Sequence, residues 1–165
     1  MLSSKYKILF IVFPALYFLD QATKAYIART MNLYTSIPVV ENFFSITYLR
    51  NKGAAFGIFA ESGFRLPFLI LASVAAVIGI IAVLRKLQPD ENLTAVALTL
   101  ILSGAMGNLM DRVRHGEVVD FLDAHWYGHH WPSFNIADSA ICVGAFLLAA
   151  GMLVEKRRLY AQKQE

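Results

Sequence analysis

The stretch that decides the fold is Gly104–Asp138, GAMGNLMDRVRHGEVVDFLDAHWYGHHWPSFNIAD. It leaves one long apolar run and enters another, with a polar segment between them. The acidic side chains at or between the ends of these runs include Asp111, Asp120 and Asp138. Carboxylates are costly at the ends of membrane-spanning helices, so each of these residues is a functional-site hypothesis.

The composition predicts a membrane protein of one domain, covering residues 1–165. Hydrophobic residues make up 57% of the chain and charged residues 16%, whereas ordinary soluble domains are about 45–50% apolar. The net charge is only +3, and no basic patch is interleaved with aromatic residues. This distribution argues against nucleic acid as a partner. Cys142 is the only cysteine, which excludes an internal disulfide.

Apolar runs predict four transmembrane helices. The clearest is Leu66–Leu84, which is free of charge between Arg65 and Arg85 and has the length of about 20 residues that a helix needs to cross a bilayer. The four expected spans cover residues of about 8–28, 66–84, 93–110 and 134–154.

The segment between the first two spans predicts a small β-element, at about residues 34–62. Phe43–Leu49 is rich in aromatic and β-branched residues, which favours a strand. Asn51–Gly53 is typical of a turn, and Ala54–Phe59 is expected to return as a second strand. Between the last two spans, Trp126–Pro132 indicates an irregular interfacial loop. The expected fold is therefore an all-α integral membrane protein of four transmembrane helices, with an extracytoplasmic β-element between helices 1 and 2.

Lysine and arginine predict the orientation. They are denser at the two termini and in the loop at residues 85–92 than in the segments on the opposite side, so the termini are expected to be cytoplasmic. Asp20, Asp111 and Asp138 then lie near the same outer leaflet, on three different spans.

Asp120 and Asp138 suggest acid–base chemistry. Two carboxylates in one site of low dielectric constant do not both ionise readily, so one keeps a proton while the other is charged. Such a pair can activate water against an amide carbonyl, with Asn108, Arg112 and Asn135 orienting the acids or the substrate. The residues alone are equally compatible with ion or proton translocation, for which buried acids also serve.

Other polar residues give weaker signals. Asp20 and Lys24 are four residues apart in a predicted helix, a spacing typical of a structural ion pair. The histidines, with His125 and His129 placed to share a helical face, lack an HExxH pattern, so no metal site is expected. Ser103 and Gly104 lack the context of a serine intramembrane protease.

Several sequence blocks resemble the bacterial lipoprotein signal peptidase (signal peptidase II) family. The blocks occur in the order expected over four spans. The five blocks are Asp20-Gln21-x-Thr23-Lys24, Asn51-Lys52-Gly53-Ala54-Ala55-Phe56-Gly57, Gly107-Asn108-x-x-Asp111-Arg112, Gly116-x-Val118-Val119-Asp120-Phe121 and Phe134-Asn135-x-Ala137-Asp138.

The resemblance implies an intramembrane aspartic endopeptidase that cuts prolipoproteins just before a diacylglyceryl-modified cysteine. Asp120 and Asp138 map to the catalytic dyad. The residues that map to supporting or substrate-binding positions are Asn108, Arg112, Asn135, Asp111, Asn51, Gly53, Asp20 and Lys24.

The same resemblance implies the surroundings of the protein. The expected location is the bacterial cytoplasmic (inner) membrane, with several spans, cytoplasmic termini and an active site near the outer, periplasmic leaflet. Expected partners are lipid-modified prolipoproteins, membrane lipid and the cyclic peptide inhibitor globomycin. No metal and no organic cofactor is expected.

Overall fold

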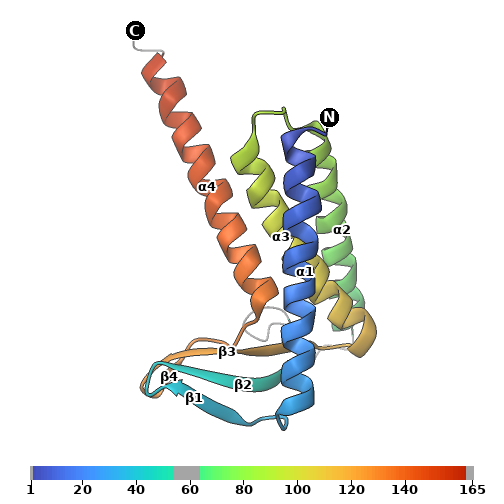
Figure 1. The fold of residues 1–165 in the computed structure, drawn as a ribbon, viewed down its shortest axis with the longest axis vertical. Helices are drawn as coiled ribbons and strands as arrows, with labels where there is room; N and C mark the ends of the chain where they lie inside the picture. The colour runs from blue at the N-terminus through green and yellow to red at the C-terminus, as the bar shows by residue number, and fades with distance from the viewer. Residues whose placement is uncertain (1, 54–63, 163–165) are drawn as a thin grey trace.

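The computed structural model of the chain describes residues 2–53 and 64–162. Its described part contains four long helices and a small sheet (Figure 1). The helices are α1 Ser4–Thr30, α2 Arg65–Lys86, α3 Asn92–His115 and α4 Ile136–Gln162. All four contain stretches long and apolar enough to cross a membrane, so the prediction of four spans is confirmed.

Helix α3 is the centre of the bundle. It packs against α1, α2 and α4, and its residues Ala95, Ala97, Thr99 and Ser103 are almost completely buried. Glycines allow two of these close approaches. A Cβ atom at Gly107 would lie 2.5 Å from the Asp20 carboxylate, and one at Gly144 would lie 2.6 Å from the backbone oxygen of Ala97. The glycine at position 107 therefore makes room for a charged group of α1.

The end of α3 directs the chain into the sheet. Gly116 has a φ of 74° and its N–H bonds to the carbonyl oxygen of Arg112. This left-handed conformation is the usual helix C-terminal cap for which glycine is favoured. The chain then turns away from the helix axis and starts a strand two residues later, at Val118.

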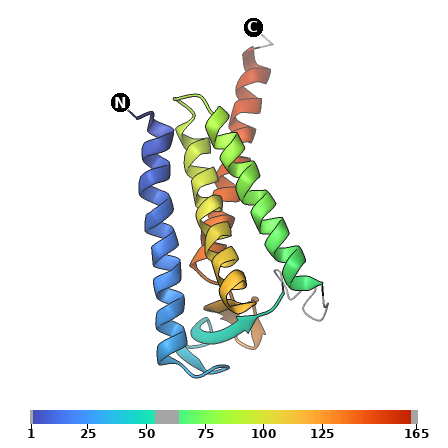
Figure 2. The same ribbon diagram turned by 90° about the vertical axis from the view of Figure 1, so that its right-hand side faces the viewer.

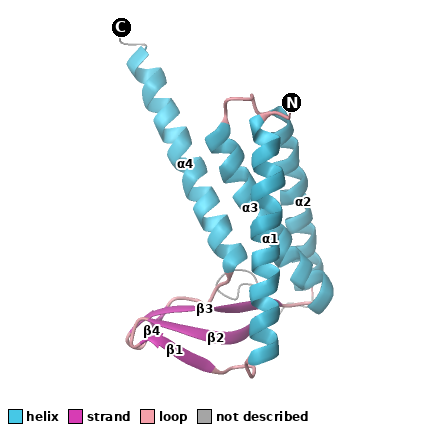
Figure 3. Ribbon diagram, viewed as in Figure 1, coloured by secondary structure: helices cyan, strands magenta, loops and turns pink. Residues whose placement is uncertain are grey.

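The sheet has four antiparallel strands in the order β1-β2-β3-β4 (Figure 3). Its strands are β1 Ser36–Val40, β2 Phe44–Asn51, β3 Val118–Trp126 and β4 His129–His130. The predicted strand at Phe43–Leu49 is thus confirmed as β2. The predicted return strand at Ala54–Phe59 lies outside the described residues.

Two expectations about the sheet were wrong. Trp126–Pro132, expected to be an irregular loop, contains the last residue of β3 and the whole of β4. The sheet, expected between α1 and α2 alone, takes half of its strands from the segment between α3 and α4. His125 and His129 lie on these strands, so the alternative of a shared helical face does not apply. The physical reason is that β3 pairs along most of its length with β2, and a pairing partner so distant in sequence leaves no local signal.

The sheet lies at the end of the helices opposite the two chain termini (Figures 1 and 2). Ile27 near the end of α1 packs against Tyr48 of β2 and against Val119 and Phe121 of β3. This cluster fixes β3 against α1. As a consequence, the strand that carries Asp120 passes close to the first turn of α4.

Candidate active site

The first turn of α4 positions Asp138. The residue before the helix, Asn135, accepts a hydrogen bond through its side-chain oxygen from the Asp138 N–H at 2.9 Å. In return, the Asn135 N–H donates to Asp138 Oδ2 at 3.2 Å. This reciprocal arrangement is a capping box, which satisfies helix N–H groups and orients both side chains.

Asp120 is held from two directions. Its Oδ1 accepts a hydrogen bond from Asn135 Nδ2 at 2.8 Å, and its Oδ2 accepts one from Asn51 Nδ2 at 2.9 Å. Asn51 is the last residue of β2, and its own side-chain oxygen accepts the Gly53 N–H at 2.9 Å. Strand pairing between β2 and β3 therefore supplies one of the two groups that orient Asp120.

Asn135 connects the two acids. Its backbone N–H bonds to Asp138 and its side-chain amide bonds to Asp120, so the two carboxyl groups share one residue as their donor. The pKa of the Asp120 carboxyl is raised to about 7, first by burial and then by the negative charge of Asp138, whereas the hydrogen bonds from Asn51 and Asn135 lower it. A carboxyl with this pKa exchanges a proton near neutral pH.

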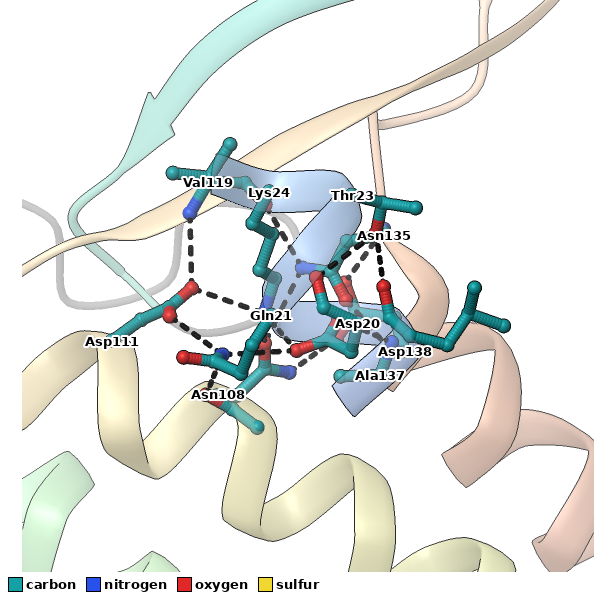
Figure 4. A network of polar contacts seen from close by, with 12 residues as sticks. Asp20, Gln21, Thr23, Lys24, Asn108, Asp111, Val119, Asn135, Ala137 and Asp138 are labelled. Carbon is teal, nitrogen blue, oxygen red and sulfur yellow. Dashed lines mark hydrogen bonds and ion pairs between the residues drawn. The ribbon is translucent and has the colours of Figure 1, made fainter. Parts of the chain in front are cut away.

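Asn108 of α3 joins this pair to a second polar cluster. Its Nδ2 donates to Asp138 Oδ1 at 2.7 Å. Its Oδ1 accepts hydrogen bonds from Lys24 Nζ at 2.9 Å and from Asn135 Nδ2 at 3.3 Å. Figure 4 shows these side chains converging from α1, α3 and the start of α4. Asn108 thus fixes Asp138 on one side and a buried lysine on the other.

The second cluster is centred on the Lys24 ammonium, which is only 3% exposed. Lys24 Nζ lies 2.9 Å from Asp20 Oδ2 and 3.0 Å from Asp111 Oδ2. Asp20 also accepts the Ala137 N–H at 2.9 Å, which ties α1 to the first turn of α4. The expected ion pair of Asp20 and Lys24 is thus present, and Asp111 is a second anion for the same cation.

Gln21 completes this cluster, and sequence reasoning gave it no role of its own. Its amide nitrogen lies 3.2 Å from Asp20 Oδ2 and 3.0 Å from Asp111 Oδ1, where it donates to both anions (Figure 4). Besides its place in the Asp20-Gln21-x-Thr23-Lys24 block, its signal was its position beside an acid near the end of an apolar span. That signal does not distinguish a buried donor from a residue at the membrane surface.

Arg112 and Gly53 lie at the edge of the pair. The Arg112 guanidinium donates to the backbone oxygens of Gly53 at 3.3 Å and of Asn108 at 3.5 Å. Among the described residues it forms no ion pair with Asp120 or Asp138. The structure therefore joins all ten site residues predicted from the sequence in one network of polar contacts. Arg112 belongs to this network through the backbone oxygens of Gly53 and Asn108.

The histidines form a separate group on the sheet. His130 Nδ1 lies 2.9 Å from Asp123 Oδ1, and His125 Nε2 lies 3.2 Å from Ser45 Oγ. The rings of His125 and His130 are stacked at 4.6 Å between centroids. Within residues 2–53 and 64–154, no group of three or more histidine, cysteine or acidic side chains has the arrangement of a metal site.

Comparisons with known sequences agree over most of the chain. Residues 12–154 match the family model described as signal peptidase (SPase) II. A lipoprotein signal peptidase of Geobacter sulfurreducens is 64% identical over 141 residues, covering 85% of this chain and 88% of the relative. One of Geobacter metallireducens is 55% identical over 153 residues, covering 93% and 94%.

Solved structures show the same architecture. A bacterial membrane enzyme determined by the in meso method at 2.3 Å resolution superposes with a TM-score of 0.82 at 34% identity, covering 90% of this chain and 88% of that one. A second, at 1.9 Å resolution, gives a TM-score of 0.78 at 36% identity, covering 88% and 92%. The chain is a multi-pass membrane protein that belongs to the signal peptidase II family of aspartic peptidases.

Proposed function

We propose that this peptidase removes the signal peptide from prolipoproteins, cutting just before a diacylglyceryl-modified cysteine, with Asp120 and Asp138 as its catalytic residues. The observation that carries the assignment is the pair of carboxyl groups held by Asn135, one of them with a pKa raised to about 7. The substrate class is supported by relatives that are named lipoprotein signal peptidases.

In the proposed reaction, the pair holds one proton, which we assign to Asp120, whose pKa is raised to about 7 by burial and by the charge of Asp138. Asp138 takes a proton from water while the water oxygen attacks the scissile carbonyl carbon. Asp120 gives its proton to the carbonyl oxygen. General acid–base assistance of this kind is worth roughly 10²–10⁴-fold in rate.

The tetrahedral intermediate then breaks down through the same two groups. Asp138, now protonated, gives its proton to the leaving nitrogen as the carbon–nitrogen bond breaks. Asp120 takes a proton back from the intermediate as the carbonyl re-forms. The products are a carboxyl terminus on the signal peptide and a free amino group on the cysteine, and the pair again holds one proton.

The remaining polar residues have supporting roles in this proposal. Asn51, Asn108 and Asn135 hold the carboxyl groups in position through their amide N–H groups. Asp20, Lys24 and Asp111 act as positioning residues, because Lys24 reaches the site only through Asn108. Arg112 and Gly53 are placed to bind the peptide backbone of the substrate near the cut.

The proposed setting is the bacterial inner membrane, with cytoplasmic termini. The distribution of lysine and arginine supports this orientation, which puts the sheet and the dyad at the periplasmic leaflet. Membrane lipid surrounds the spans, and a cyclic peptide such as globomycin would compete for the same site. Translocation of ions is disfavoured, because residues 66–84 and 93–110 contain no charged side chain that could form a polar path through the bilayer.

The decisive experiment replaces each acid by its uncharged amide. Purified Asp120→Asn and Asp138→Asn variants are incubated with a diacylglyceryl-modified prolipoprotein in detergent or liposomes, and cleavage is followed by gel shift. We expect each variant to lose cleavage by at least the 10²–10⁴-fold of one acid–base group, while its thermal unfolding stays that of a folded protein.

Asp123→Asn is the matched control, because Asp123 is also buried on β3 and its carboxyl group, within the described residues, bonds to His130 and to neither dyad residue. It should cleave like the parent chain. Substantial residual cleavage by either dyad variant, or an equal loss in Asp123→Asn, would refute the assignment.

A further inference from the structure

The tip of the sheet carries a cluster of exposed aromatic rings, which we call the aromatic tip. Its members are Phe43, Trp126, Tyr127 and Trp131, with exposed fractions of 45%, 66%, 61% and 60%. The ring of Phe43 lies 5.6 Å from that of Trp126 and 6.2 Å from that of Tyr127, between centroids. Three of these rings thus support one another while leaving much of their surface uncovered.

The tip has two chemically different faces. Side chains alternate along a strand, so Trp126 lies on the same face of β3 as Asp120, the face turned toward the start of α4. Asp123 and His125 lie on the opposite face, where they bond to His130 and Ser45. One face of the tip is therefore aromatic and the other is polar and titratable.

The position of the tip relates it to the membrane. The sheet lies at one end of the spanning helices and extends sideways beyond them (Figures 1 and 3). The helices themselves expose large apolar side chains such as Leu71, Ile78 and Phe146, which face lipid in a multi-pass protein. On the edge strand β1, Ile37, Val39 and Val40 are also exposed. Large apolar side chains are thus exposed on the sheet as well as on the spans.

We infer that the aromatic tip is a membrane anchor that inserts into the headgroup region of the bilayer beside the spans. Tryptophan and tyrosine are enriched at this depth because their rings are apolar while their N–H or O–H groups bond to water and headgroups. The occupant of the exposed surface is thus phospholipid. Anchored at both α1 and the tip, the sheet would hold Asp120 at a constant depth relative to a lipid-modified substrate.

The composition of the chain provides a direct test, because its two tryptophans, Trp126 and Trp131, are both in the tip. The full chain is reconstituted without substrate into phosphatidylcholine vesicles, some of whose acyl chains carry bromine either near the headgroup or near the chain end. Tryptophan emission is then measured, along with its quenching by iodide in the water phase. We expect strong quenching by the shallow bromines, weaker quenching by the deep ones, and protection from iodide.

Single variants separate the two rings. Trp126→Phe and Trp131→Phe each leave one tryptophan and keep the tip aromatic, and both are expected to show the shallow pattern. Two reference positions calibrate the measurement in a chain carrying both replacements. Ile78→Trp, on the exposed side of α2, should be quenched best by deep bromines, and Asp90→Trp, in the exposed turn before α3, by iodide.

Emission that is insensitive to brominated lipid and open to iodide would refute the proposal and leave the tip free for a protein partner. Quenching best by the deep bromines would also contradict it, because the tip would then lie below the headgroup region. Neither result depends on cleavage, so the outcome is independent of the dyad assignment.

Discussion

The site contains two pairs of aspartates that differ in one respect, the presence of a cation. Asp20 and Asp111 share the ammonium of Lys24, at 2.9 and 3.0 Å. Asp120 and Asp138 receive only N–H groups of asparagine side chains and backbone, and no lysine or arginine of the described chain forms an ion pair with them. Asn108 touches both groups.

This difference separates a structural role from a chemical one. A buried carboxylate bonded to a cation keeps its charge, because losing the charge would leave the cation unpaired. A buried carboxylate held by neutral donors beside another acid takes up a proton more easily, as the raised pKa of Asp120 indicates. The first pair ties α1 to α3 and α4, and the second pair has the surroundings that suit the proton exchange proposed above for the dyad.

The largest expected effect comes from removing the cation. Lys24→Met leaves Asp20 and Asp111 buried without their partner, and breaking a buried ion pair on one side costs about 3–5 kcal/mol of stability. We expect a marked drop in the thermal unfolding temperature in detergent. The double variant Lys24→Met with Asp111→Asn should recover part of it, and an unchanged unfolding temperature in Lys24→Met would remove the distinction between the two pairs.

Neutralising Asp120 should stabilise the folded chain near neutral pH, whereas Lys24→Met should destabilise it. Because the pKa of Asp120 rises from 3.8 to about 7 on folding, the folded chain binds more protons than the unfolded one between these pH values. The contribution of Asp120 to stability is therefore fully present below about pH 4 and is lost as pH rises through 7. Asp120→Asn should reduce the loss of stability between pH 4 and 8 by up to a few kcal/mol. The unfolding temperatures of the variant and the parent chain at each pH measure this change. If the unfolding temperature of Asp120→Asn falls more steeply with rising pH than that of the parent chain, the raised pKa is contradicted.

A smaller shift is expected from Asn51. Its amide hydrogen bond lowers the pKa of Asp120, so Asn51→Ala should raise that pKa further. If Asp120 holds the shared proton, the alkaline limb of kcat/KM for prolipoprotein cleavage moves to higher pH. Movement of the acid limb instead would mean that Asp138 holds the shared proton and Asp120 acts as the base. If neither limb moves, Asn51 does not influence the dyad.

The smallest effect is expected at Lys52, next in the chain to Asn51. Lys52 Nζ lies 3.6 Å from Glu117 Oε1, and the lysine side chain is mostly exposed. Exposed ion pairs contribute about 0–1 kcal/mol, so Lys52→Met should leave the unfolding temperature and both limbs of the pH profile nearly unchanged. It is the matched control for Lys24→Met and for Asn51→Ala. A loss of stability comparable to that of Lys24→Met would mean that burial does not explain the difference between the two ion pairs.

The sequence was most informative where the signal is local. Length and uninterrupted apolarity predicted the four spans, because a bilayer imposes about 20 apolar residues on each helix. Aromatic and β-branched residues predicted β2. The acids near span ends, such as Asp138, were informative because a charge is costly there. The cost of an unpaired charge at Asp138 suggested Asp120 as its partner, and the resemblance to a known family implied the same pairing.

Only the tertiary structure decided how those acids are held. The pairing of β2 with β3 joins Asn51 to Asp120, and the capping box at Asn135 joins Asp120 to Asp138. The assignment of Lys24 to one pair of acids depends on the contact of α1 with α3. These are contacts between residues far apart in the chain, and their energies come from burial and geometry that local sequence does not encode. The sequence therefore determined which groups the protein has at the membrane boundary, and folding determined which of them bond to a cation and which are held by neutral donors beside another acid.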